Sequence, residues 1–323
     1  MLTVANKVAT DVIGQNYPNY LLFHNSIRKG GILYNLIYFY SRLLRIGIID
    51  GYFNNAKSSF CTIFAYGIGF ILSKSGVVDK KGSDQMTTLL CYIVLPCAIL
   101  NSFQMEFTYS MLHNFAIMCA ITFGIHVLNI LASQLIFNKK RVIDNEQKCV
   151  LQFSSIYSNT GFMGFPLLEA MAGKNGLFYG SAYNSVFGLF LWTQGFLLYS
   201  RKLDKKSILK AFLNPNIIAS VIGLFLYCFS LKLPGPIYLS VKYLAQLNTG
   251  LSMIVIGTTM TQISFRKMFK GIQAWECVVM RNLILPFALL FILYAIGLRG
   301  QLLLCSVIPA ACPVAGFPYY LLN

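Results

Sequence analysis

The sequence is poor in charged residues, and most of the charge that it has is positive. Only 11% of the 323 residues are charged, whereas a soluble globular domain has about 25%. Acidic residues are the scarcer class, with 10 Asp and Glu against 26 Lys and Arg. Because 56% of the residues are hydrophobic, this composition excludes an ordinary water-soluble protein and favours one that is dissolved in lipid.

The sequence also lacks the patterns by which many enzymes and metal sites are recognised. It has no H-E-x-x-H pair, no phosphate-binding glycine loop and no Ser-His-Asp arrangement, so we expect a protein that is not an enzyme. Its nine cysteines form no C-x-x-C pair and nearly all lie in apolar runs, which indicates small buried hydrophobic residues. We therefore expect no catalytic residue, no metal and no cofactor.

Apolar segments long enough to cross a bilayer, which takes about 20 residues, follow one another along most of the chain. The short loops between them hold most of the basic residues, so the net charge of +16 is expected to set the membrane topology and not to bind nucleic acid. We predict an all-α, multi-pass integral protein of the cell (plasma) membrane. The predicted spans are about 55–73, 86–104, 111–137, 148–172, 176–199, 214–231, 236–261, 274–298 and a ninth from 301.

Two of these spans are interrupted by Gly and Pro at the depth of the membrane. The fourth contains NTGFMGFP (159–166), and the ninth contains PAACPVAGFP (309–318). Pro removes a backbone donor and clashes with the preceding turn, while Gly leaves helical geometry at little cost. Unwound backbone is tolerated in a bilayer where it is buried in protein or lines a wet cavity. Since breaks at matched positions of two halves indicate a transporter site, we favour crossed discontinuous helices over two simple kinks.

The interrupted spans divide the chain into two comparable parts. Residues 53–200 are predicted to form a first inverted repeat of five transmembrane helices, and residues 201–323 an incomplete second repeat of about four, with the final helix missing. An odd number of spans per repeat turns the second copy over relative to the first. Residues 1–52 are a predicted N-terminal extension with an interfacial amphipathic helix, because their apolar run at 31–41 is too short to span.

Uncharged polar residues inside the spans are candidates for a binding site. Buried amides without partners are costly in hydrocarbon, so we expect them to face one another or a cavity. For each of them, contact with a substrate and hydrogen bonding between helices are equal alternatives. These candidates are Asn159, Thr160, Asn184, Asn248 and Thr249.

Charged residues are rare inside the spans. Arg281 and Glu276 open the eighth span, and Lys242 lies early in the seventh. All three are near predicted helix ends, so we expect their charged groups to reach the membrane interface. That leaves amides and the positive ends of half-helices to meet an anion.

The run SNTGFMGFPLLEAMAGKNGLFYGSAYNSVFGLFLW resembles the broken-helix region of the auxin efflux carrier family, which includes bacterial malate-permease-like transporters. LNPNIIASVIGLFLYCFSLKLP, LNTGLSMIVIGTTM, NLILPFALL and PAACPVAG are similar to later parts of the family, so the resemblance covers about residues 55–318. Asn159, Pro166 and Pro313 map onto the crossover motifs of the family. The resemblance implies ten helices in two inverted repeats, a scaffold part and a transport part, elevator-like alternating access and carboxylate substrates. The tenth helix has no counterpart here, so we expect a C-terminally truncated member.

The function predicted from these features is that of a secondary transporter or permease. It would move a small organic anion, a carboxylate such as malate or an auxin-like acid, by alternating access across the lipid bilayer. Whether transport is coupled to a proton or to a sodium ion stays open, and so does whether the protein forms a homodimer. The alternatives are a non-transporting truncated fragment and an anion channel, which large single-channel currents would distinguish from the saturation and counterflow of a carrier.

Overall fold

A computed structural model describes residues 64–138, 141–142, 144–200, 212–261 and 272–315. The predicted extension at 1–52 and the chain beyond residue 315 lie outside the described residues. The described chain is built of helices and contains no β-strand. This confirms the all-α fold class.

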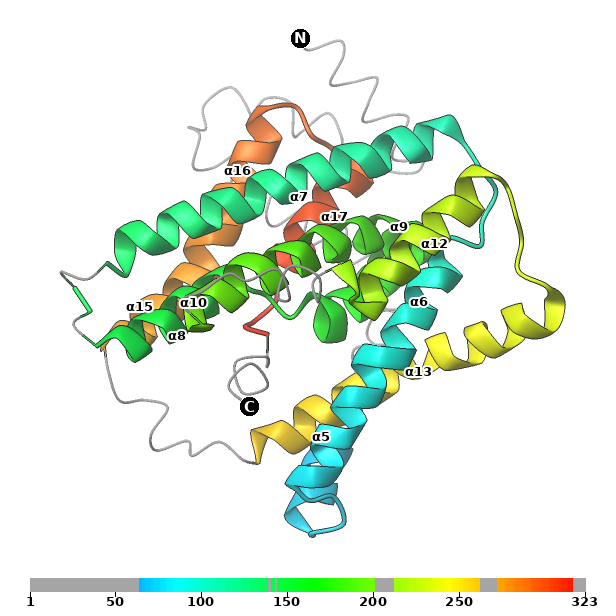
Figure 1. Cartoon of the computed structure of the whole chain (residues 1–323). Helices are drawn as coiled ribbons and strands as arrows, with labels where there is room; N and C mark the ends of the chain where they lie inside the picture. The colour runs from blue at the N-terminus through cyan, green and yellow to red at the C-terminus, as the bar shows by residue number, and fades with distance from the viewer. Residues whose placement is uncertain (1–63, 139–140, 143, 201–211, 262–271, 316–323) are drawn as a thin grey trace, which may run out of the picture. The chain divides into compact units, whose positions relative to one another are not determined.

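The described helices run in chain order as Figure 1 labels them. The first part holds an apolar helix at Phe64–Lys74, then α5 (Lys80–Leu89), η3 (Leu90–Val94), α6 (Leu95–Ser102), α7 (Tyr109–Ile136), α8 (Asn145–Ile156), η4 (Thr160–Gly164), α9 (Phe165–Phe190), η5 (Leu191–Gly195) and α10 (Phe196–Ser200). The second part holds α12 (Pro215–Cys228), α13 (Gly235–Met260), α15 (Ile272–Val279), η6 (Met280–Ile284), α16 (Leu285–Ala295) and α17 (Gly300–Ala311). The η elements are single π-helical turns, wider than an α-helix.

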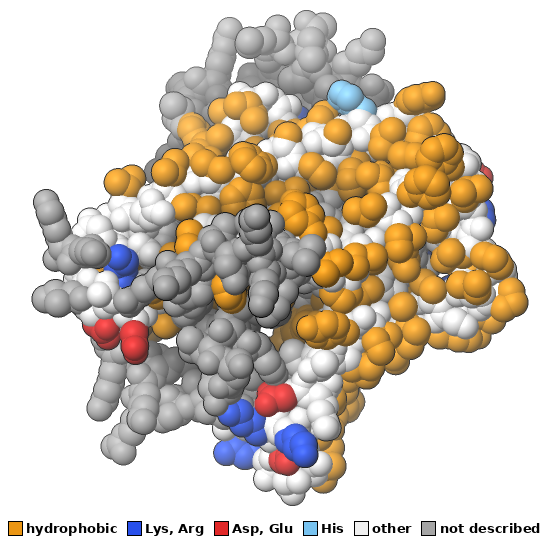
Figure 2. All heavy atoms as spheres, viewed as in Figure 1, with side chains coloured by type: hydrophobic (Ala, Val, Ile, Leu, Met, Phe, Trp, Pro, Cys, Tyr) orange, Lys and Arg blue, Asp and Glu red, His pale blue; other side chains and the backbone are white. Residues whose placement is uncertain are grey.

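The described helices present an apolar surface. Large hydrophobic side chains are exposed along them, as on α12, where Val221 is 63% and Phe225 55% exposed. Figure 2 shows hydrophobic side chains across most of the described part of the visible face, with few charged ones. Such a surface suits lipid and not water. Among the described residues three helices are long and apolar enough to cross a membrane: Lys80–Ser102, Tyr109–Ile136 and Ile272–Ala295.

Three of the π turns end two residues before a proline. η3, η4 and η6 are followed, at the second residue after each, by Pro96, Pro166 and Pro286. In each case the residue before the proline donates its N–H to the carbonyl five positions back. Proline cannot donate and crowds the carbonyl four residues earlier, and a wider turn accommodates both effects without ending the helix. The prolines therefore widen these helices where the sequence suggested that Pro166 would break one.

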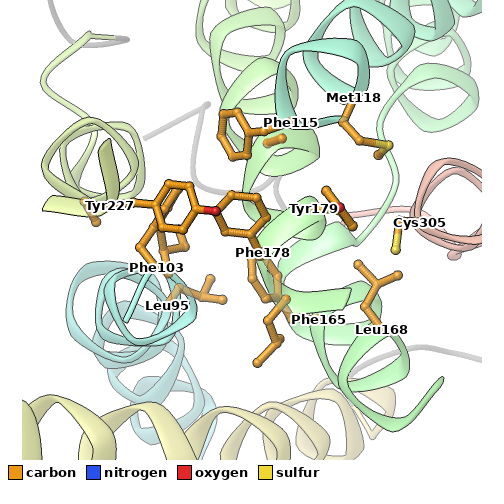
Figure 3. Close-up of a cluster of buried hydrophobic side chains, with 14 residues drawn as sticks. Leu95, Phe103, Phe115, Met118, Phe165, Leu168, Phe178, Tyr179, Tyr227 and Cys305 are labelled. Carbon is orange, nitrogen blue, oxygen red and sulfur yellow. The ribbon is translucent and has the colours of Figure 1, made fainter. Parts of the chain in front are cut away.

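The helices pack as two sets. The helix at Phe64–Lys74, α5, α6, α12 and α13 form one set, and α7, α8, α9, α15, α16 and α17 form the other. Aromatic rings join the two sets, and Figure 3 shows them meeting around Phe178 of α9. The ring centroid of Phe178 lies 5.2 Å from that of Phe103, the residue after α6, 5.2 Å from that of Phe115 of α7 and 5.0 Å from that of Tyr227 of α12.

Candidate functional site

The two interrupted helices meet at their breaks. α8 and α17 each end in extended backbone, and the two extended segments lie antiparallel, with a bridge between Ser158 and Val314. The first break lies at 157–159, just before the predicted 159–166, and Pro313 is in the second. Two backbone hydrogen bonds flank the bridge, from Asn159 N–H to the Pro313 carbonyl at 2.7 Å and from Ala315 N–H to the Tyr157 carbonyl at 3.1 Å.

Asn159 both joins the two breaks and begins the next helix. Its backbone is not helical (φ −79°, ψ 67°), and its side-chain Oδ1 accepts the N–H of Phe162 at 3.2 Å. Its carbonyl accepts the N–H groups of Met163 and Gly164. Asn is among the best residues for such an N-cap, because its side chain satisfies a donor that the first helical turn leaves free. The helix that starts here continues from η4 into α9.

A buried hydrogen bond connects the start of this helix to its distal part. The hydroxyl of Thr160 donates to Oδ1 of Asn184 at 3.2 Å, and both residues are buried. In a straight helix these positions would be about 36 Å apart, so the chain folds back between them. The turn lies at Gly173, whose φ of 57° and ψ of −141° are not helical. The halves of α9 on either side of Gly173 correspond to the end of the predicted fourth span and to the fifth.

The remaining predicted site residues lie on α9 and α13, two helices that contact η4. Pro166 is buried in the first turn of α9. Asn248 and Thr249 lie on α13, which contacts η4. Asn248 is 3% exposed and its Oδ1 accepts no hydrogen bond in the described part of the chain. The structure thus links Asn159, Thr160, Asn184 and Pro313 by hydrogen bonds, whereas among the described residues no such bond joins Asn248 or Thr249 to them.

Arg281 is a central residue that the sequence interpretation misplaced. It was expected at the membrane interface, but its side chain is 1% exposed and lies in η6, within the span Ile272–Ala295. Counted from 274, where the predicted eighth span begins, Arg281 lies about 10 Å into a hydrocarbon core of about 30 Å, and this depth was the signal in the sequence. By contrast, Glu276 and Lys242 are exposed, in keeping with their expected position.

The guanidinium of Arg281 binds the ends of both interrupted helices. Its Nη1 donates to the carbonyls of Ser155 and Ile156 at 3.1 and 3.2 Å, at the end of α8. Its Nη2 donates to the carbonyl of Cys312 at 3.2 Å, just after α17. The last carbonyls of a helix have no partner within the helix, so one side chain satisfies acceptors that both breaks expose.

No carboxylate accompanies this buried cation in the described part of the chain. The titratable side chains close enough to act on Arg281 electrostatically include Tyr183, Cys277, Cys312 and His126, and none of these types is ordinarily negative at neutral pH. Its Nε–H is buried and has no hydrogen-bond partner among the residues that the structure describes. The partners of the cation are therefore backbone carbonyls at two helix ends.

Comparison with known proteins gives a family and a distant relative. The model of a family described as membrane transport protein matches residues 57–205 and 199–321. An uncharacterized transporter from Methanocaldococcus jannaschii is 26% identical over 208 residues, which cover 60% of this chain and 65% of that relative. The match thus spans slightly less than two thirds of the relative's length.

Proposed function

The chain belongs to the membrane transport protein family, as its resemblance to the auxin efflux carriers predicted, and on this premise we propose that it is a secondary transporter of a small organic anion. The observation that supports this most directly is the antiparallel pairing of the two helix breaks through Ser158, Val314, Asn159 and Pro313. Paired half-helices of this kind place free helix ends and polar groups together inside the membrane.

In this proposal the carboxylate of the substrate binds at the start of η4. The N-terminal end of a helix carries about half a positive charge, which favours an anion. Asn159 and Thr160 stand at this end, with Asn184 hydrogen bonded to Thr160. Asn248 and Thr249 would contribute from α13, which contacts η4. Pro166 and Pro313 would shape the backbone around the substrate.

Alternating access would move the two sets of helices against each other. The crossover lies in the set that holds α8, α9 and α17, and the set of α5, α6, α12 and α13 would act as the scaffold. Residues 53–200 and 201–323 would be the two inverted repeats. The contact that must rearrange includes the aromatic cluster of Phe103, Phe178 and Tyr227, which lies between the sets.

Replacement of Asn159 by Ala tests the site. The variant loses a cap, which costs about 1 kcal/mol of helix stability, and should insert into membranes while its uptake of labelled malate or indole-3-acetate into proteoliposomes falls at least tenfold. Asn138→Ala is the matched control, because the Oδ1 of Asn138 also accepts a backbone N–H, from Arg141, but at the exposed end of α7.

The outcomes separate the site from the function. Unchanged uptake kinetics in Asn159→Ala would remove the assignment of the site. Large single-channel currents without saturation or counterflow in the unaltered protein would favour a channel over a carrier.

A further inference from the structure

At the crossover, a cation compensates the partial negative charges at the C-terminal ends of two helices. α8 and α17 both end here, and each helix C-terminus carries about half a negative charge. The full positive charge of the Arg281 guanidinium is hydrogen bonded to carbonyls at both ends. The two negative helix ends and the one cation therefore balance approximately.

For the positive helix end at the crossover, the described part of the chain shows no such counter-charge. η4 begins at Thr160 and runs directly into α9, and neither has an acidic residue in its first turn. The nearest acidic residue along α9, Glu169, is exposed. The N-terminal end of η4 therefore retains its partial positive charge, while Arg281 cancels the partial negative charges at the ends of α8 and α17.

We propose that Arg281 sets the charge selectivity of the crossover by cancelling the negative ends of α8 and α17, so that a carboxylate is bound in preference to a neutral molecule of the same shape. This inference rests on the proposed function and deepens it. Arg281 acts as a positioning residue, since it contacts backbone carbonyls and acts on the substrate through the field at the site.

The environment of Arg281 is costly for a residue with a purely structural task. Among the described residues this buried cation has no carboxylate partner, which leaves a desolvation penalty, and its buried Nε–H is an unsatisfied donor. A neutral amide could also donate to these carbonyls without that penalty. The side chain thus supplies a charge where hydrogen bonding alone would not require one.

Two variants test the charge balance from opposite sides. Arg281→Gln keeps a donor and removes the cation, so the negative ends of α8 and α17 become uncompensated. Asn159→Asp keeps the acceptor that caps the Phe162 N–H and adds a negative charge at the positive end. Asp and Asn are about equally good N-caps, so this second variant is expected to fold even if the first does not. Arg299→Gln is the matched control, because it removes the same charge from an exposed position.

The measurement compares carboxylates with their amides on purified protein. Indole-3-acetate is paired with indole-3-acetamide, and malate with malamide, and the dissociation constants are obtained from the rise in melting temperature with ligand concentration. We expect the unaltered protein and Arg299→Gln to bind a carboxylate more tightly than its amide. In Arg281→Gln and Asn159→Asp this preference should fall by about tenfold or more, because each change makes the site one unit charge more negative in a medium of low effective dielectric constant.

The outcomes of this experiment and of the transport assay are separable. A preference for carboxylate that is unchanged in Arg281→Gln, or in Asn159→Asp if the other variant does not fold, overturns the inference. Absence of any preference in the unaltered protein also overturns it. Loss of the preference in the variants, together with binding but no uptake by the unaltered protein, supports the inference and refutes the proposed transport.

Discussion

Gly257 of α13 lies against the backbone of the helix at Phe64–Lys74, and its replacement by Ala should destabilise the protein. A Cβ at Gly257 would stand 2.2 Å from the carbonyl oxygen of Tyr66, and one at Gly69 would stand 2.2 Å from the carbonyl oxygen of Ile254. Carbon and oxygen atoms in contact are normally about 3.3 Å apart or more. The two helices would therefore have to separate by about 1 Å, because the obstructing atoms are backbone and cannot rotate away.

The size of the effect follows from two opposing contributions. Ala in place of Gly stabilises a helix interior by about 1 kcal/mol, while overpacking costs about 1–3 kcal/mol. We expect Gly257→Ala to lower the free energy of unfolding by about 1–2 kcal/mol. This is the upper part of the overpacking cost minus the gain in helix propensity. Gly250→Ala is the control on the same helix, since a Cβ there has no atom within 4 Å and brings only the gain.

The assay is thermal unfolding of the detergent-solubilised protein, with the melting temperatures of Gly257→Ala, Gly250→Ala and the unaltered chain compared. Gly257→Ala should melt below the unaltered chain and Gly250→Ala at or above it. The double variant Gly69→Ala/Gly257→Ala should be less destabilised than the sum of the single changes, because one separation of the helices relieves both contacts. Equal stability of Gly257→Ala and Gly250→Ala would refute the close packing.

Two further substitutions probe the elements around the crossover. Gly173→Ala should lower the free energy of unfolding by about 1–3 kcal/mol, because the φ of 57° and ψ of −141° at this position suit glycine and not an L side chain. The control in thermal unfolding is Gly124→Ala, which also has open space around it but no positive φ, and which should not be destabilised. Equal stability of the two variants would contradict the strained turn. Tyr157→Phe should lower the free energy of unfolding by about 1–3 kcal/mol, because the hydroxyl of Tyr157 donates to the Phe190 carbonyl at 2.8 Å and contacts Gln194 Oε1 at 2.5 Å. The control in chemical unfolding is Tyr109→Phe, a change at an exposed tyrosine. A loss of stability no larger than that of Tyr109→Phe would show that the hydrogen bond of Tyr157 adds nothing.

The sequence predicted the two broken helices for a physical reason that does not depend on the rest of the fold. A run such as NTGFMGFP cannot form a regular α-helix, because Pro166 lacks a donor and its glycines favour other conformations. How the backbone would respond was not determined by the same residues. It stays helical through a π turn before Pro166 and leaves helical geometry at 157–159, where partners from the second break are present.

For the binding candidates, too, some features were predictable from the sequence and others were not. Asn159 was recognisable because it directly precedes the Gly-rich run, and the structure makes it a helix cap paired with Pro313. Its bond to Pro313 joins residues far apart in sequence, and the matched positions of the two breaks had predicted that they cross without predicting this bond. The role of Arg281 could not be read from its neighbours along the chain, because its partners come from α8 and from the segment after α17.

The sequence by itself determined that this chain is an all-α membrane protein with two interrupted helices, since these follow from apolar length and from the backbone chemistry of Gly and Pro. Only the tertiary structure decided which backbone groups pair the two breaks and that Arg281 joins the ends of both helices. The reason is that the hydrogen bonds at a break require acceptors and donors from distant segments, which the fold brings together.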